Sequence, residues 1–219
     1  MTRLFVTPMK AYPMGLTHDE FLSIFSNVEV LEKCHTDLLG TIEQRLARWD
    51  DDSTIGDVFL TETGFIKLYR YYVNNYENSL VVLAQCRKKS AEFDAYLKKW
   101  ELTPEMRNSQ LTAFLVAPVQ RVMRYSMLLE EVLKKTPREH PDAEPLRRAV
   151  AMMKSMAEYI NEKKRDVENT AAFEALRAKI KHLPADIVAD PKRVLLREGG
   201  VALNTPSAHV YVFLFSDML

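Results

Sequence analysis

The chain has 219 residues, and its 30 Lys and Arg balance 30 Asp and Glu, so the formal net charge is zero. A hydrophobic fraction of 47% at this length excludes a chain that is disordered throughout, and the balanced charge argues against nucleic acid as a partner. Two cysteines can build neither a disulfide framework nor a four-cysteine zinc site, and they fit a reducing compartment.

The first elements are an extended segment and a long helix. Pro8 and Pro13 punctuate residues 3–16, which predicts an extended backbone there. Thr17 and Glu20 then form a capping box, in which each side chain reaches the backbone of the other residue. Apolar residues recur at helical spacing from Phe21 to Trp49 and predict one helix over 17–49.

Four further helical stretches and a β segment follow. We expect helices over 64–89 with an interruption at Asn74-Asn75, over 90–100, over 108–135 with a break at Pro118, and over 145–181. In the last of these, one face carries Leu146, Ala149, Met153, Met156, Ile160 and Val167. Residues 194–203, with an irregularity at Gly199-Gly200, and 210–215 read as strands. Two short strands cannot bury their own faces, so this tail either begins a β domain or leans on the helices.

The stretch after Leu115 carries apolar groups on two faces of a helical wheel. The expected core arc holds Leu115, Pro118, Val122, Tyr125, Leu129, Val132 and Leu133. The opposite arc mixes polar and apolar side chains, namely Gln120, Arg124, Glu131, Lys135, Val116, Met123, Met127 and, at its margin, Leu128. Such a face indicates either a partner surface or coverage by another helix of the same domain, and periodicity alone leaves both open.

Motifs for covalent chemistry are missing from the sequence. No glycine precedes a lysine as in a P-loop, and neither H-E-x-x-H nor G-x-S-x-G occurs. Cys34 and His35 are the one metal-like pair, whereas zinc needs four convergent ligands. We therefore expect no metal, no cofactor and no bond-making enzyme activity.

Residues 111–129, LTAFLVAPVQRVMRYSMLL, resemble the third conserved region of the Dbl homology domain, the exchange-factor domain for Rho-family GTPases. Residues 72–76, YVNNY, and 159–165, YINEKKR, match the same family, and residues 194–219 resemble the first strands of a pleckstrin homology domain. The resemblance implies a mainly α fold, an elongated bundle of long helices followed by a partial β segment. It places the exchange domain at 1–183 and the beginning of a pleckstrin homology-like domain, truncated, at 184–219. The family's first conserved region would precede Arg3 and is not visible.

The resemblance also implies a GTPase-binding surface. The matching contact positions are Gln120, Arg124 and Asn161, while Val116 matches a position that senses which GTPase is bound. Met127 and Leu128 extend the apolar part of this surface. Arg121 and Tyr125 read as structural, with Arg121 at the edge of the core arc, where it could pair with an acid.

The function that follows is guanine nucleotide exchange on Rho- or Rac-type GTPases in the cytoplasm. The domain would remodel the switch segments, disfavour Mg²⁺ and nucleotide, and prefer the nucleotide-free partner. Recruitment to a phosphoinositide membrane would need a complete pleckstrin homology domain. The alternative is a non-catalytic helical adaptor or pseudo-exchange module that binds a small GTPase or another protein.

Overall fold

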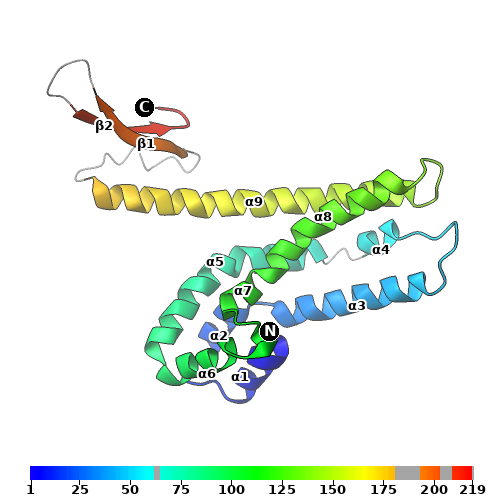
Figure 1. Ribbon diagram of the computed structural model, residues 1–219, viewed down its shortest axis with the longest axis horizontal. Helices are drawn as coiled ribbons and strands as arrows, with labels where there is room; N and C mark the ends of the chain where they lie inside the picture. The colour runs from blue at the N-terminus through cyan, green and yellow to red at the C-terminus, as the bar shows by residue number, and fades with distance from the viewer. Residues whose placement is uncertain (62–64, 181–192, 203–208, 219) are drawn as a thin grey trace. The chain divides into compact units, whose positions relative to one another are not determined.

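A computed structural model of the chain describes residues 1–61, 65–180, 193–202 and 209–218. It divides into two compact units, Met1–Asn161 and Glu162–Leu219, and the boundary falls within the long helix α9 (Ala143–Lys179). Long helices dominate, as expected, with a two-stranded sheet near the C-terminus (Figure 1). The expected helix limits at Gly64 and Lys181 and the expected domain boundary at 183–184 lie outside the described residues. No helix in the described ranges is long and apolar enough to cross a membrane.

The first segment is helical as far as Ala11, so the extended conformation expected for residues 3–16 is wrong for residues 3–11, whereas Tyr12 is extended and residues 12–16 are not helical. A π-helical turn, η1 (Thr2–Val6), leads directly into α1 (Thr7–Ala11). Pro8 lies in the first turn of α1, and the Leu4 carbonyl four residues before it accepts a hydrogen bond from the Tyr96 hydroxyl at 2.6 Å instead. Phe5 and Met9 are fully buried, so this segment is held in place by its apolar side chains.

The single helix expected over 17–49 is also wrong, because the chain breaks at Ser26. The capping box at Thr17 and Glu20 is confirmed, and it starts α2 (His18–Phe25), which is followed by α3 (Val28–Leu46). Ser26 takes a φ of 51° between them. The amide of Asn27 donates to the Leu68 carbonyl at 3.0 Å, which offsets the hydrogen bonds lost at the break.

Helix α5 (Phe65–Lys89) runs without the interruption expected at Asn74-Asn75. Both amide side chains bond outside their own helix rather than competing for its backbone. Asn74 accepts a hydrogen bond from the Tyr159 hydroxyl, and Asn75 donates to the Ser23 carbonyl at 2.7 Å. A short helix that the sequence did not predict, α4 (Gly56–Thr61), precedes α5.

The proline break is confirmed. After α6 (Ala91–Glu101), which Ser90 caps, and the 3₁₀ turn η2 (Pro104–Met106), the chain forms α7 (Leu111–Leu115) and α8 (Ala117–Lys135). Pro118 lies in the first turn of α8, and the Leu115 carbonyl at the end of α7 accepts a hydrogen bond from the Tyr72 hydroxyl at 2.8 Å. The break is therefore anchored to α5.

The core of the helical unit is formed by buried side chains from η1 through the first half of α9. Of the α9 face expected to be apolar, Leu146, Ala149, Met153, Met156 and Ile160 are buried. Val167 belongs to the second unit and is 37% exposed.

In the second unit, β1 (Leu195–Ala202) pairs antiparallel with β2 (His209–Phe215). The pairing irregularity lies between Leu195 and Arg197, whereas Gly199 and Gly200 pair in register, so the irregularity expected at the glycines is wrong. Phe215 stacks on Phe173 of α9 with ring centroids 5.8 Å apart. Phe215 is thus buried against the helix of its own unit, whereas the other side chains described in the two strands are half-buried or exposed.

Candidate functional site

Helix α8 has one buried stripe, as the wheel predicts. Val122, Tyr125 and Leu129 are buried, and Leu133 packs against the core. Val132 is 43% exposed, so its place in the core arc is wrong. At 100° per residue, Val132 lies 100° from Leu133 and about 20° beyond Tyr125, at the outer edge of the stripe.

The opposite face of α8 is largely exposed within the described helical unit. Gln120 and Arg124 are exposed, and Met127 and Leu128 are 66% and 61% exposed. Cover by another helix of the unit is therefore wrong for these positions. Met123, by contrast, is partly buried against the core, so the face is not free along its whole length.

The two remaining predicted site residues lie elsewhere. Val116 is half-buried at the junction of α7 and α8, where its backbone joins the two helices. Asn161 is exposed on α9, at the end of the helical unit. The structure thus presents Asn161 on a different element from the α8 residues.

A groove of about 760 Å³ lies beside the exposed face of α8. Its lining brings three of the predicted residues together, Gln120, Arg124 and Leu128. The rest of the lining comes from the N-terminal residue and from η1, α3, α7 and α8: Met1, Thr2, Val28, Leu31, Glu32, His35, Phe114, Ala117, Pro118, Arg121 and Tyr125.

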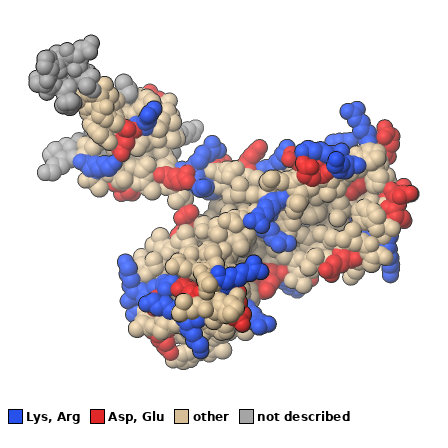
Figure 2. Space-filling model, viewed as in Figure 1, with Lys and Arg blue, Asp and Glu red and all other residues tan. Residues whose placement is uncertain are grey.

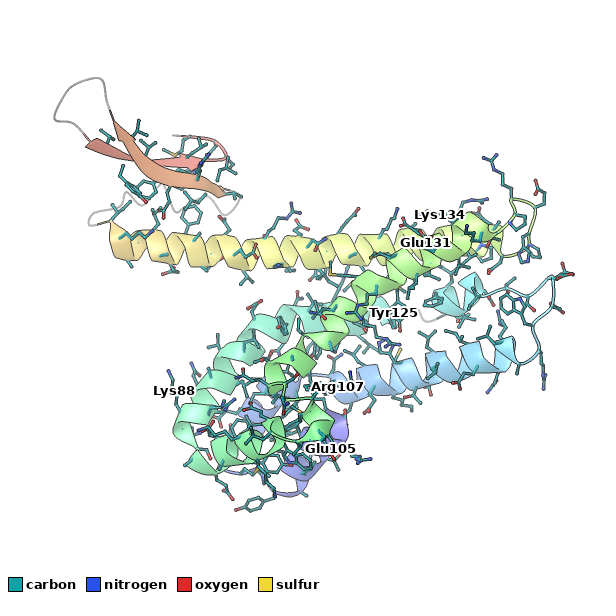
Figure 3. The ribbon with its side chains drawn as sticks, viewed as in Figure 1. Lys88, Glu105, Arg107, Tyr125, Glu131 and Lys134 are labelled. Atoms are coloured by element: carbon teal, nitrogen blue, oxygen red, sulfur yellow. The ribbon has the colours of Figure 1, made fainter. Side chains whose placement is uncertain are left out.

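A chain of hydrogen bonds beneath this groove was not predicted from the sequence. Arg121 Nε donates to the Tyr125 hydroxyl at 2.7 Å, and its guanidinium lies 5.3 Å from the centre of the Tyr125 ring. The same hydroxyl lies 3.1 Å from His35 Nδ1, and His35 Nε2 lies 2.6 Å from the Tyr69 hydroxyl. The partner of Arg121 is thus a phenol, and pairing with an acid is wrong here. Figure 3 labels Tyr125 near the middle of α8.

The pKa values of His35 and Tyr125 in this hydrogen-bond network are shifted mainly by burial. Burial, followed by the charge of Arg121, lowers the pKa of His35 to about 4, so the imidazole is neutral at neutral pH. Burial also raises the pKa of Tyr125, which stays protonated. Both ring nitrogens of His35 face tyrosine hydroxyls, an arrangement for hydrogen bonding rather than for a metal ligand. No group of three His, Cys, Asp or Glu in the described ranges could hold a metal ion.

Charges of both signs are interspersed over the face shown in Figure 2. Many are paired locally on the helix surface, as Glu131 and Lys134 are on α8 (Figure 3). Exposed pairs of this kind contribute little to stability. In the described part of the chain, the ion pairs include neither Arg121 nor Arg124. Arg121 is instead engaged by Tyr125, and both guanidinium groups line the groove.

The RhoGEF domain model matches residues 1–161, and the chain belongs to the RhoGEF domain family. Guanine exchange factor for Rac 30 of Dictyostelium discoideum is 33% identical over 220 residues, 100% of this chain and 13% of that protein. FYVE, RhoGEF and PH domain-containing protein 2 of Homo sapiens is 32% identical over 216 residues, 96% of this chain and 32% of that protein. The chain thus spans less than a third of the length of either relative.

Solved structures share the fold at lower identity. Vav1 bound to an allosteric inhibitor is 24% identical, with a TM-score of 0.74 over 97% of this chain and 38% of that one. The DH/PH fragment of PDZRHOGEF, solved in complex with human RhoA, is 20% identical, with a TM-score of 0.70 over 97% of this chain and 65% of that one. At these identities the likeness shows the fold alone.

Proposed function

We propose that this chain is a guanine nucleotide exchange module for a Rho-family small GTPase, acting without bond chemistry and without a cofactor. Family membership and relatives named as Rac exchange factors support this proposal. The observation that carries it is the exposed face of α8, where Gln120 and Arg124 lie beside Met127 and Leu128. Polar side chains that lie among exposed apolar side chains are typical of a protein-binding surface.

The side chains suit contact with a GTPase switch segment. Gln120 and Arg124 are spaced i and i+4, so they share one helix face. The Arg124 guanidinium offers a planar fork of donors to carboxylates or carbonyls, and Gln120 and Asn161 can each donate and accept. Val116, at the junction of α7 and α8, is the position proposed to sense which GTPase is bound.

The mechanism requires differential binding rather than a covalent step. The module would hold the switch segments in a form that coordinates Mg²⁺ and phosphate poorly. Linkage makes the effect reciprocal, because a factor that weakens nucleotide binding is itself weakened by nucleotide in the same ratio. The preferred partner is therefore the nucleotide-free GTPase.

The test uses the double variant Gln120→Ala with Arg124→Ala, which removes both polar side chains from this face of α8. Release of a fluorescent GDP analogue from Rac- and RhoA-type GTPases should fall to the uncatalysed rate. Helicity and Tm should stay close to those of the unaltered chain, because both side chains are exposed. The matched control is Glu131→Ala with Lys134→Ala, an exposed pair on the same helix, which should leave exchange unchanged. Loss of folding in the first variant would make these residues structural.

The same assay distinguishes an exchange module from a non-catalytic adaptor. An adaptor would bind a GTPase from the panel without accelerating nucleotide release. Binding without acceleration by the unaltered chain would thus contradict the exchange proposal.

We further propose that the exchange domain extends over 1–183 and that 184–219 begin a pleckstrin homology-like domain. The β1–β2 hairpin and the likeness to DH/PH structures support this division. Contact with a phosphoinositide membrane, and recruitment from the cytoplasm, are proposed for a complete domain of that type.

A further inference from the structure

Thr136 lies where α8 ends and the loop to α9 begins. The residue caps the helix, and its backbone is extended, with φ −87° and ψ 124°. Pro137 follows it, and a proline disfavours the helical conformation for the residue before it. The threonine is half-buried, while Pro137, Arg138 and Glu139 are exposed. A hydroxyl on extended backbone before a proline is the pattern that proline-directed serine/threonine kinases recognise, since the proline brings no backbone N–H that the kinase would have to pair.

Other Thr-Pro pairs provide a comparison within the same chain. The sequence contains four such pairs, at 7–8, 103–104, 136–137 and 205–206. The fourth lies outside the described residues. A kinase must contact residues on both sides of the acceptor hydroxyl, so burial of the flanking residues decides which pair it can reach.

At the first two pairs, flanking residues belong to the core. Thr7 is helical, and Val6 before it and Met9 after it are each 1% exposed. Thr103 has an extended backbone, but Met106, three residues later, is fully buried. Binding to a kinase would have to pull these apolar side chains out of the core, which is costly. Both threonines are therefore shielded in the folded chain.

The surroundings of Thr136 present a much lower barrier. Lys134 and Lys135, the last two residues of α8, are exposed (Figure 3 labels Lys134). On the other side, the His140 N–H donates to the Pro137 carbonyl at 3.2 Å and closes a turn. An extended path through the acceptor requires the end of α8 to fray and this one hydrogen bond to open. The side chains from 134 to 139 are exposed or half-buried, so none has to leave the core.

We propose that Thr136 is phosphorylated by a proline-directed serine/threonine kinase. In that step Thr136 Oγ1 attacks the γ-phosphorus of ATP bound to the kinase, and a P–O bond forms. The bond between this phosphorus and the β–γ bridging oxygen breaks, its electron pair leaves with ADP, and the hydroxyl proton passes to a carboxylate of the kinase. The site lies outside the α8 residues assigned to GTPase binding, and the proposal does not depend on exchange activity.

The modification would change the end of α8. The Thr136 hydroxyl donates to the Val132 carbonyl at 2.9 Å, and the phosphoryl group takes the place of that proton. It also brings about two negative charges to the C-terminal end of the helix, which is the negative end of its dipole. Lys135 and Arg138 can pair with the phosphate, but they do not restore the lost hydrogen bond. We expect the last turn of α8 to open more often.

The test compares the folded chain with peptides. The substrates are the full 219-residue chain carrying Thr205→Ala, and synthetic peptides of residues 97–110 and 130–143. Each is incubated with ATP, Mg²⁺ and a mitogen-activated protein kinase, and the phosphate is located by tandem mass spectrometry. Dividing the rate in the chain by the rate in the matching peptide removes the intrinsic sequence preference at each site.

This ratio should be at least about tenfold higher for Thr136 than for Thr103, because the fold opens more easily around Thr136. Equal ratios would overturn the selection of Thr136 by the fold. A phosphorylated 130–143 peptide beside an unmodified chain would show that the loop is inaccessible. Failure of both to react would show that the sequence is not a substrate. Either result would overturn the proposal.

Variants of the full chain then test the acceptor and its proline. Thr136→Ser keeps the hydroxyl and should remain a substrate, whereas Thr136→Val should lose the phosphate at this position. Pro137→Ala should lower the rate at least about tenfold, since alanine restores the backbone N–H. Arg138→Gln, on the other side of the proline, is the matched control and should have a smaller effect. Phosphorylation at an undiminished rate in Pro137→Ala would overturn the assigned class of kinase.

Hydrogen exchange measures the consequence for α8. In the phosphorylated chain, amides of 133–136 should exchange severalfold faster than in the unmodified chain, while those of 146–160 should be unchanged. Thr136→Val is the control, because it loses the hydrogen bond without adding charge, and its effect should be smaller. Slower exchange at 133–136 after phosphorylation would show that Lys135 and Arg138 hold the phosphate against the helix end, and it would overturn the expected opening.

Discussion

Gly56 lies where α4 begins against the start of α9. Its backbone N–H donates to the Asp142 carboxylate at 2.9 Å, and the N–H of Ile55 donates to the same carboxylate at 2.8 Å. Asp142 is 3% exposed, so these bonds join two segments that are 86 and 87 residues apart. A Cβ at Gly56 would lie 2.4 Å from the Leu146 nitrogen. The close approach of two backbones therefore requires glycine here.

Gly56→Ala should destabilise the helical unit by about 1–3 kcal/mol, because backbone atoms rather than a flexible side chain must move. The measurement is the urea midpoint followed by fluorescence of Trp49 and Trp100. Gly40→Ala is the matched control, since Gly40 lies within α3 and a Cβ there meets nothing within 4 Å. That change should stabilise by about 0.5–1 kcal/mol. Equal effects of the two substitutions would contradict the close approach at Gly56.

Residue patterns predicted part of the site and missed part of it. The exposed positions of Gln120 and Arg124 follow from their i, i+4 spacing opposite the buried stripe of α8. The chain that joins Arg121, Tyr125 and His35 could not be predicted, because His35 and Tyr125 are 90 residues apart in sequence. The one local sequence signal for this hydrogen-bond network is a basic residue, Arg121, four positions before Tyr125.

At the scale of elements, the sequence predicts helix content better than helix limits. The break at Pro118 follows from local chemistry, because a proline removes a backbone donor. The break at Ser26 depends on Leu68 and Asn75, which reach this turn from α5. The continuity of α5 likewise depends on Tyr159 and Ser23. Local propensity cannot predict such long-range partners.

Helix α2 is joined to the end of α5 by an ion pair whose strength depends on pH. Lys89 Nζ donates to both carboxylate oxygens of Glu20, at 2.8 and 3.1 Å, and Glu20 also accepts from the Thr17 backbone. The bonds from Lys89, followed by the one from Thr17, lower the pKa of Glu20 to about 2. A lowered pKa in the folded state means that this stabilisation is full above about pH 4.5 and is lost as the pH falls toward 2.

Glu20→Gln keeps an oxygen for the capping box but removes the charge. We expect its Tm to lie about 2 °C below that of the unaltered chain at pH 7, and the two values to converge near pH 2. Thermal melts across this pH range provide the measurement. Asp19→Asn is the control, because it also removes a charge from the first turn of α2. Its Tm difference from the unaltered chain should not depend on pH in the same way. A constant Tm difference from pH 7 to pH 2 would contradict the assigned cause.

At the scale of the whole molecule, burial along α9 changes at the boundary between the two units. From Leu146 to Ile160 the helix buries a regular apolar face in the core of the helical unit. From Glu162 to Lys179, all described, Leu176 is the buried side chain. A helix gains most of its stability from packing, so its second half should open at a lower free energy than its first.

Phe215→Ala should separate the two units in hydrogen exchange. Phe215 is 5% exposed and stacks on Phe173, and an isolated two-stranded hairpin is marginally stable, so removing this ring should release β1 and β2. Exchange measured by mass spectrometry should rise at least about tenfold in 162–179 and in both strands. Amides of α5, α8 and Leu146–Ile160 should keep their protection, because their packing does not involve Phe215. Tyr211→Ala, at a β2 position that is 56% exposed, is the control and should have a smaller effect. Faster exchange throughout α8 in the Phe215 variant would instead show that the two units unfold as one.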